Sequence, residues 1–338
     1  MIKVVKKGGD IKLRFFSIFL SLFLGACVST SKEPVEVNQT PSSRFDLYDS
    51  QNTLPITVDS APKTAEEAVE RAKGEERLGH LDQALYLYVQ ALDFNSENAI
   101  VLYHIARIHS IKGNVQLAYQ TYSEALAIDP LMMMAHAGLG LINMERRQHA
   151  DATKNLHMAV GLDQARLAQL KTTELKEEFY QLDSDSPLRI YNALAILYDL
   201  DNSHEQARSY YELARLKAPN SALITTNLGY SYYLSGDISM AEHYLKQAVK
   251  EDPSFNRGWS NLGLVYVKKG QYLRALSTLE HIMSPADALN DLGYFLMLEG
   301  QYEQAIAFFK QAIDRSPSYF DQAQKNLKRA SMEFEHRK

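Results

Sequence analysis

The chain has 338 residues, of which 46% are hydrophobic and 23% charged, a globular balance that argues against wholesale disorder and against many membrane spans. A formal net charge of −5 argues against the basic field on which nucleic-acid binding depends. The single cysteine excludes an intrachain disulfide framework and a zinc site built on several thiolates.

The first 26 residues have the layout of a signal peptide. An apolar run from Phe15 to Leu24 follows five basic residues, which are Lys3, Lys6, Lys7, Lys12 and Arg14. A helix needs roughly 20 apolar residues to cross a bilayer, so this run does not predict a permanent transmembrane span. We expect residues 1–26 to be removed from the mature chain.

The apolar run ends in Leu24-Gly25-Ala26-Cys27, which resembles the lipobox of bacterial lipoproteins. The resemblance implies that Cys27 becomes the N-terminus of the mature chain and carries the acyl chains that anchor it. The alternative is a buried, unmodified thiol, but nothing around Cys27 resembles a core element. Because Val28 rather than an aspartate follows, the resemblance implies the periplasmic face of the outer membrane.

Residues 27–63 are expected to form a lipidated, flexible linker. Four prolines and many Ser, Thr, Asn and Gln residues interrupt any helical periodicity there. Phe45, Leu47 and Tyr48 could instead dock on a partner or on the folded part, but scattered apolar residues of a tether are the interpretation that we favour.

Small residues recur in fixed registers over the rest of the chain. A series of alanines has steps of 34, 34, 55, 34, 34 and 30 residues. Small side chains let two helix backbones approach closely, so this spacing predicts repeated pairs of antiparallel helices. Glycines inside the pairs predict the turns, with Arg147 and Asn202 as departures. The series is Ala84, Ala118, Ala152, Ala207, Ala241, Ala275 and Ala305, and a second series twelve residues before it includes Gly229, Gly263 and Gly293.

The runs NLGYSYYLSGDISMAEHYLKQAVKEDP (227–253) and LNDLGYFLMLEGQYEQAIAFFKQAIDRSP (289–317) resemble the tetratricopeptide repeat. The resemblance implies an all-α fold, a right-handed superhelix (α-solenoid) of about seven helix-turn-helix repeats. They begin near residues 65, 99, 133, 188, 222, 256 and 286.

The unequal steps divide the repeats into blocks. Residues 64–163 are expected to hold three repeats, and residues 188–317 four. The 55-residue step leaves residues 164–187 over, where apolar residues set among charges predict an inserted helix and a hinge. The 30-residue step shortens the second helix of its repeat, and residues 318–338 are expected to form a capping helix.

In the tetratricopeptide family the first helix of each repeat lines a groove that binds peptides. Asn227 and Asn261 stand just before Leu-Gly, where family members use the amide to hold a peptide backbone. A merely solvated helix face is the alternative at each position. The resemblance implies a partner-binding groove made of Tyr103, Arg107, Asn192, Asn227, Tyr230, Tyr233, Arg257, Asn261, Asn290 and Tyr294, with Asp291 beside them.

No catalytic or metal site is predicted. His104, His109 and His136 lack carboxylate or thiol partners at ligand spacing, and the sequence contains no nucleophile motif or glycine-rich phosphate loop. We therefore expect no cofactor, no metal, no nucleic-acid partner and no small-molecule substrate.

Three functions remain. Anchor and repeats together favour a non-enzymatic scaffold for the proteins of an envelope pilus or secretion complex. The last four repeats resemble the TadD-type lipoprotein of tight-adherence (Flp pilus) systems, which implies assistance to pilus or secretin assembly. A lipoprotein similar to the pilotins of type IV pili, or an adaptor for cell-wall hydrolases, is the alternative. An enzyme is least favoured, because the repeats leave no room for a catalytic domain.

Overall fold

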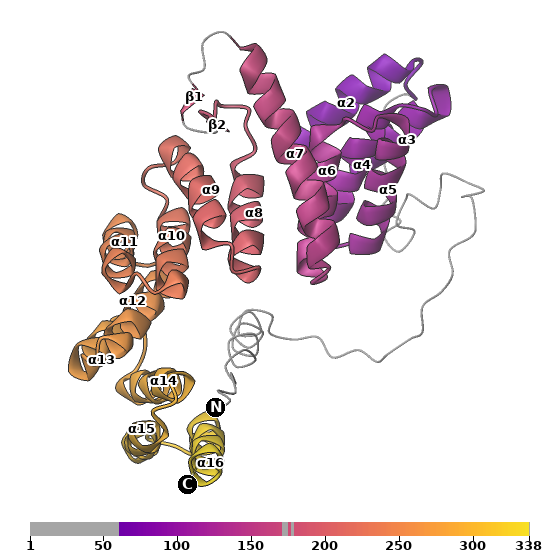
Figure 1. Ribbon diagram of the computed structural model, residues 1–338. Helices are drawn as coiled ribbons and strands as arrows, with labels where there is room; N and C mark the ends of the chain where they lie inside the picture. The colour runs from indigo at the N-terminus through magenta and orange to yellow at the C-terminus, as the bar shows by residue number, and fades with distance from the viewer. Residues whose placement is uncertain (1–60, 171–174, 177–178, 338) are drawn as a thin grey trace, which may run out of the picture. The chain divides into compact units, whose positions relative to one another are not determined.

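The computed structural model describes residues 61–170, 175–176 and 179–337 (Figure 1). The predicted signal peptide, Cys27 and the linker as far as residue 60 lie outside these residues. The described chain divides into two compact units, the N-terminal unit of residues 61–197 and the C-terminal unit of residues 198–337. Their boundary falls within helix α8 (Leu188–Leu200), after the segment 164–187 in which the sequence predicts a hinge.

Helix hairpins make up each unit. In the N-terminal unit α2 (Ala65–Arg77) packs on α3 (Leu81–Phe94), α4 (Ala99–Ile111) on α5 (Val115–Ile128), and α6 (Met133–Glu145) on α7 (His149–Gln169). In the C-terminal unit α9 (His204–Lys217) precedes the hairpins α10 (Ala222–Ser235) with α11 (Ile238–Glu251), α12 (Asn256–Lys268) with α13 (Tyr272–Leu279), and α14 (Pro285–Leu298) with α15 (Tyr302–Arg315). The predicted all-α fold of repeated helix pairs is confirmed.

Left-handed residues form the turns inside the hairpins. The conformation suits glycine, which has no Cβ to clash with the backbone. Arg147 and Asn202 adopt it as well, with φ of 60° and 59°, at a cost of roughly 1 kcal/mol each. The predicted turn is therefore kept even where the sequence departs from glycine. The glycines with φ from 70° to 87° are Gly79, Gly113, Gly236, Gly270 and Gly300.

Small residues lie where the two helices of a hairpin touch. A Cβ added to Gly229 would lie 2.8 Å from Cγ of Leu245, and one added to Gly293 would lie 2.8 Å from Cε1 of Phe309. Both of these larger side chains are fully buried, as are all the alanines of the repeated series. The close approach predicted from the registers is thus what holds each hairpin together.

Helix α16 (Asp321–Glu335) covers the end of the C-terminal unit. It contacts α14 and α15. Ala323 and Ala330 are fully buried, and Leu327 and Phe334 pack against the core. This is the predicted capping helix. The short second helix is also present, since α13 has 8 residues where α11 has 14.

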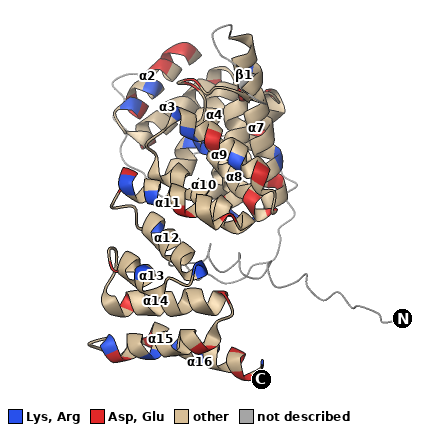
Figure 2. Cartoon of the chain, turned by 60° about the vertical axis from the view of Figure 1, so that its left-hand side comes forward, with Lys and Arg blue, Asp and Glu red and all other residues tan. Residues whose placement is uncertain are grey.

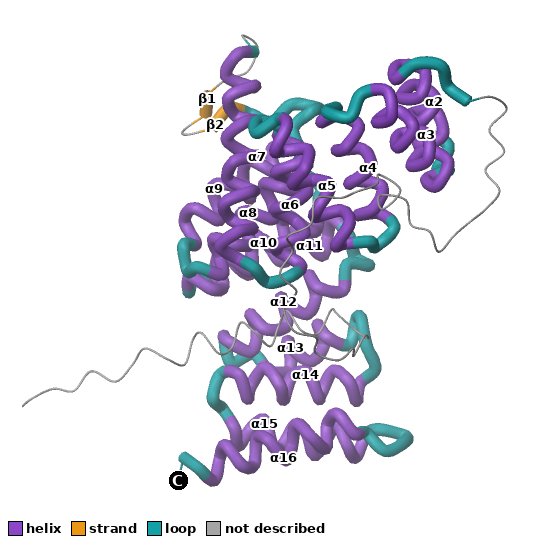
Figure 3. Tube along the Cα trace, turned by 90° about the vertical axis from the view of Figure 1, so that its right-hand side faces the viewer, coloured by secondary structure: helices purple, strands orange, loops and turns teal. Residues whose placement is uncertain are grey.

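The segment 164–187 differs from the prediction, because its described residues (164–170, 175–176 and 179–187) contain no separate inserted helix. Its first residues extend α7 to 21 residues, and Leu167 is buried in the last turn. Two short antiparallel strands follow, β1 (Leu175–Lys176) and β2 (Phe179–Tyr180), near the C-terminal end of α7 (Figure 3). The prediction failed because a short apolar run has no periodicity that separates helix from strand.

Candidate functional site

The first helices of the C-terminal unit, α10, α12 and α14, share one surface, which we call the first-helix face. Helix α10 contacts α12, and α12 contacts α14, so equivalent residues of successive repeats are neighbours. Asn227, Asn261 and Asp291 each stand two residues before the buried glycine of their helix. These three side chains therefore follow one another along the face, but each has a different environment.

Asn227 is held by a guanidinium of the next repeat. It is 8% exposed, and its Oδ1 accepts a hydrogen bond from Nη2 of Arg257. The guanidinium also lies over the Phe255 ring, 5.5 Å from its centroid, and its buried Nε has no hydrogen-bond partner among the described residues. Burial lowers the pKa of Arg257 from its ordinary value. The pair thus presents a partly desolvated positive charge.

Two predicted tyrosines of α10 form a rigid aromatic pair. The rings of Tyr230 and Tyr233 are stacked with their centroids 5.8 Å apart. The hydroxyl of Tyr233 donates to Oε1 of Glu299 at 2.8 Å, and Lys268 pairs with the other oxygen of that carboxylate. Burial raises the pKa of Tyr230 to about 12, and burial with the nearby Glu299 raises that of Tyr233 further. Both phenols are therefore neutral at physiological pH.

Asn261 occupies the middle of the first-helix face. It is 6% exposed, and its side-chain amide makes no hydrogen bond within the described part of the chain. The amide is not among the enclosed polar atoms that lack a partner, so it keeps access to solvent and can bind water or a ligand. This makes Asn261 the strongest of the predicted positions for a backbone contact with a partner.

Asp291 and Tyr294 continue the face on α14. Burial raises the pKa of Asp291 to about 6, opposed by a hydrogen bond from Asn290 and reinforced by the charge of Asp287. The hydroxyl oxygen of Tyr294 is buried without a partner among the residues described, and burial raises the pKa of Tyr294. The end of the face thus carries a hydroxyl without a partner and a carboxylate whose hydrogen bond comes from Asn290.

Asn290, another predicted position, is engaged inside the unit. Its Oδ1 accepts from Nδ2 of Asn326 on α16 at 3.0 Å, and its own Nδ2 lies 3.3 Å from Oδ1 of Asp291. Asn290 is 6% exposed and joins the last hairpin to the capping helix. The sequence could not reveal this, because Asn326 is distant in the chain.

The candidates of the N-terminal unit are also tied to neighbours. Arg107 forms an ion pair with Glu76 of α2, and Nδ1 of His104 lies 3.3 Å from the other oxygen of the same carboxylate. The hydroxyl of Tyr88 donates to Glu76 at 3.0 Å. Burial lowers the pKa of His104. Arg107 therefore serves first to join α4 to α2.

Tyr103 and Asn192 are placed separately in that unit. Tyr103 is partly buried, with its ring centroid 6.2 Å from that of Tyr122, and burial raises its pKa to about 12. Asn192 lies partly exposed on α8. The structure thus gathers the candidates Asn227, Tyr230, Tyr233, Arg257, Asn261, Asn290 and Tyr294 on neighbouring helices of one unit, and it places the other three in the N-terminal unit.

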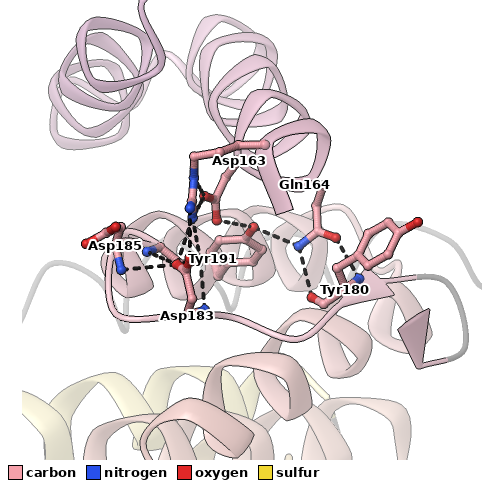
Figure 4. Close-up of polar contacts among 8 residues, drawn as sticks. Asp163, Gln164, Tyr180, Asp183, Asp185 and Tyr191 are labelled. Carbon is pink, nitrogen blue, oxygen red and sulfur yellow. Dashed lines mark hydrogen bonds and ion pairs between the residues drawn. The ribbon is translucent and has the colours of Figure 1, made fainter. Parts of the chain in front are cut away.

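The insertion carries a polar cluster that the sequence did not predict. Gln164 of α7 donates through Nε2 to the backbone oxygen of Tyr180 and accepts at Oε1 from its backbone N–H, at 3.2 and 2.8 Å (Figure 4). The same amide nitrogen donates to the hydroxyl of Tyr191 at 3.0 Å. A single side chain thus satisfies both backbone groups of β2 at this residue.

Arg166 holds two carboxylates in the same cluster. Its Nη2 lies 2.6 Å from Oδ1 of Asp163, and its Nη1 2.7 Å from Oδ2 of Asp183. Asp163 is 0% exposed and also accepts from the hydroxyl of Tyr191 at 2.8 Å (Figure 4). The guanidinium keeps the pKa of Asp183 well below its usual range. The three-residue spacing of Asp163 and Arg166 was visible in the sequence, but the contribution of Asp183 was not.

Charges of both signs are distributed along the helices (Figure 2). Within the described ranges no group of three or more His, Cys, Asp or Glu side chains is arranged to hold a metal ion. No helix of the described residues is both long and apolar enough to span a bilayer.

Two family models of the tetratricopeptide repeat match the chain, one at residues 69–132 and 226–282 and the other at residues 286–319. The CTR9 homolog of Arabidopsis thaliana is 24% identical over 274 residues, which are 78% of this chain and 24% of that protein. The BBSome complex member BBS4 of Bos taurus is 23% identical over 71% of this chain and 49% of its own length. The chain thus spans about a quarter of the length of the CTR9 homolog and about half of the length of BBS4.

Among solved structures, a tetratricopeptide repeat protein from Parabacteroides merdae is similar in fold, with a TM-score of 0.53 and 15% identity. The alignment covers 80% of this chain and all of that one. The matched repeats fall on the helix hairpins described above, with a small residue at each close contact. The chain therefore contains tetratricopeptide repeats at these residues, and its helix hairpins have the α-solenoid fold.

Proposed function

We propose that this protein is a non-enzymatic scaffold that binds a polypeptide segment of its partners on the first-helix face. The observation that carries the proposal is the side-chain amide of Asn261, which lies on α12 between α10 and α14 and makes no hydrogen bond within the described residues. An amide both donates and accepts, which is what one peptide group of a bound backbone requires. Tyr230 and Tyr233 lie on the same face and offer a rigid apolar surface at little cost in entropy.

The proposed cellular setting is the periplasmic face of the outer membrane, with attachment through lipid on Cys27. Support comes from the order of basic residues, apolar run and Leu24-Gly25-Ala26-Cys27 in the sequence. A multiply acylated cysteine anchors stably, because each buried CH₂ contributes about 0.8 kcal/mol. The linker to residue 63 would let the repeats reach partners beyond the headgroups.

The proposed partners are proteins of a pilus or secretion complex, such as the secretin of a tight-adherence system. The support is the resemblance of the last four repeats, which include the first-helix face, to the lipoprotein of those systems. The proposal assigns no chemical step to this chain, and its activity consists of holding other proteins.

Site-specific crosslinking in cells tests the proposal. A photoreactive amino acid at position 261 should crosslink to a component of the pilus or secretion complex, whereas one at the exposed Lys250 of α11 should not. Asn227→Ala combined with Tyr230→Ala should reduce the crosslink at least fivefold at a temperature where circular dichroism shows that the variant is still folded. Equal crosslinking from both positions, or no effect of the double variant, would contradict a binding role for this face.

A further inference from the structure

One carboxylate of the first-helix face lacks a cation. Asp291 is partly buried on α14, and none of the ion pairs within the described residues includes it. The groups that act on it are the amide of Asn290, which donates at 3.3 Å, and the carboxylate of Asp287, one turn earlier on the same helix. Burial raises the pKa of Asp291 to about 6, so at neutral pH the ionised form is present with the hydrogen bond from Asn290 but without an ion pair.

Helix spacing and repeat equivalence place two other acceptors on the same face as this carboxylate. Tyr294 is three residues further along α14, which places it on the same side of the helix, and its hydroxyl is buried without a partner in the described chain. Asn261 occupies the position of Asp291 on α12, the neighbouring helix. Arg329 of the capping helix is exposed, and its charge acts on the phenol of Tyr294 but is not among the influences on Asp291.

We infer that Asp291, Tyr294 and Asn261 form a subsite for one lysine or arginine side chain of the polypeptide bound on the first-helix face. The inference rests on the proposed function and specifies the chemistry of the partner. A carboxylate, a phenol oxygen and an amide oxygen are all acceptors, and a basic side chain supplies N–H donors and a positive charge to them. Its aliphatic stem covers apolar surface such as the Tyr294 ring.

The charges of Arg257 and Asp291 determine where the basic residue of the bound segment binds on the first-helix face. Arg257 lies on α12 beside Asn227 and has no carboxylate partner among the ion pairs of the described C-terminal unit. It repels a cation at that position, whereas Asp291 attracts one at the next helix. The bound segment therefore has its basic residue over α14, and it has a neutral or acidic residue over the start of α12.

The size of the effect follows from the carboxylate. A cation within hydrogen-bonding distance lowers the pKa of a carboxyl by about one to three units, and one unit corresponds to a tenfold change in affinity when the group is ionised. Removing either the charge of Asp291 or the charge of the basic peptide residue should weaken peptide binding about tenfold at pH 7.5. The difference should shrink as the pH falls below about 6, where Asp291 is protonated before binding.

The test is a double-mutant cycle with selected peptides. Random dodecapeptides displayed on phage are selected on the purified full chain, and those that lose binding to Asn227→Ala/Tyr230→Ala are kept. We expect lysine or arginine at one fixed position. Replacing it by methionine should weaken binding to the unaltered chain about tenfold and leave binding to Asp291→Asn unchanged. Asp314→Asn, at an exposed acid on α15, is the control and should behave like the unaltered chain.

The outcomes separate this inference from the proposed function. One contrary result is a set of selected peptides that depend on Asn227 and Tyr230 but show no preference for a basic residue. Another is a basic residue that contributes as much to binding Asp291→Asn as to binding the unaltered chain. Either result overturns the cation subsite and leaves the binding face intact. Selection without any peptide that depends on these two residues overturns both. Circular dichroism melts confirm that each variant is folded before its affinity is compared.

Discussion

Replacing Asp291 by asparagine should increase the stability of the unliganded chain at neutral pH. Burial raises the pKa of Asp291 from 3.8 to about 6, and each unit corresponds to about 1.4 kcal/mol. Ionising this carboxyl in the folded chain therefore costs about 2 to 3 kcal/mol at pH 7.5. Asparagine has nearly the same shape without the charge, and it already occupies the equivalent position at Asn227 and Asn261.

The sign of the pH dependence is fixed by the same shift. The pKa of the folded state lies above that of the unfolded state, so the contribution of Asp291 to stability is fully present below about pH 3.8. It is lost as the pH rises through about 6. The difference between Asp291→Asn and the unaltered chain should accordingly be small at pH 4 and reach its full size at pH 7.5.

Urea and thermal unfolding at the two pH values measure this difference. At pH 7.5 we expect a gain of about 2 kcal/mol and a rise in melting temperature of about 4 to 8 °C. Asp314→Asn, at an exposed acid of α15, should change stability by less than about 0.5 kcal/mol at either pH. An equal gain at pH 4 and pH 7.5, or a loss at pH 7.5, would refute the reasoning.

Two further variants test other parts of the molecule. Cys27→Ser should remove the chain from the outer-membrane fraction without changing its helical circular dichroism, and a variant that still sediments with that membrane would contradict the lipid anchor. Arg166→Met leaves the fully buried Asp163 without its cation and should cost about 3 kcal/mol in urea unfolding. The exposed Arg189→Met is its control, and a cost no larger than that of the control would show that the Arg166 ion pairs do not stabilise the unit.

The sequence predicted the helix hairpins because their packing repeats at fixed intervals. A small residue is required wherever two backbones approach, as at Gly229 against Leu245, and this requirement recurs in every repeat. The shortened α13 followed from the same registers, and the capping helix α16 from the apolar spacing of its own residues, such as Ala323 and Ala330. The strands β1 and β2 did not, because they occur once and depend on Gln164, whose contact with Tyr180 is a tertiary interaction.

The sequence predicted which helices carry the candidate residues, but not which hydrogen bonds and ion pairs those residues form. Equivalence between repeats placed Asn227 and Asn261 on neighbouring helices, as the structure has them. It could not show that Asn290 is engaged by Asn326 of the capping helix, or that Arg107 is paired with Glu76. Repeat registers specify which residues share a face, whereas the ion pairs and hydrogen bonds depend on individual residues of the adjacent repeat.

The residue at the start of the next repeat's first helix determines whether the asparagine of the preceding first helix already has a hydrogen-bond donor or can accept one from a partner. Arg257 of α12 donates to Asn227 and satisfies it from within the unit. For Asn261 the equivalent residue is Asp287 of α14, an acceptor that receives the hydroxyl of Ser284 at 2.6 Å and has no donor to offer the amide oxygen. The following repeat therefore offers Asn261 no donor equivalent to Arg257, and a bound segment can supply that donor instead.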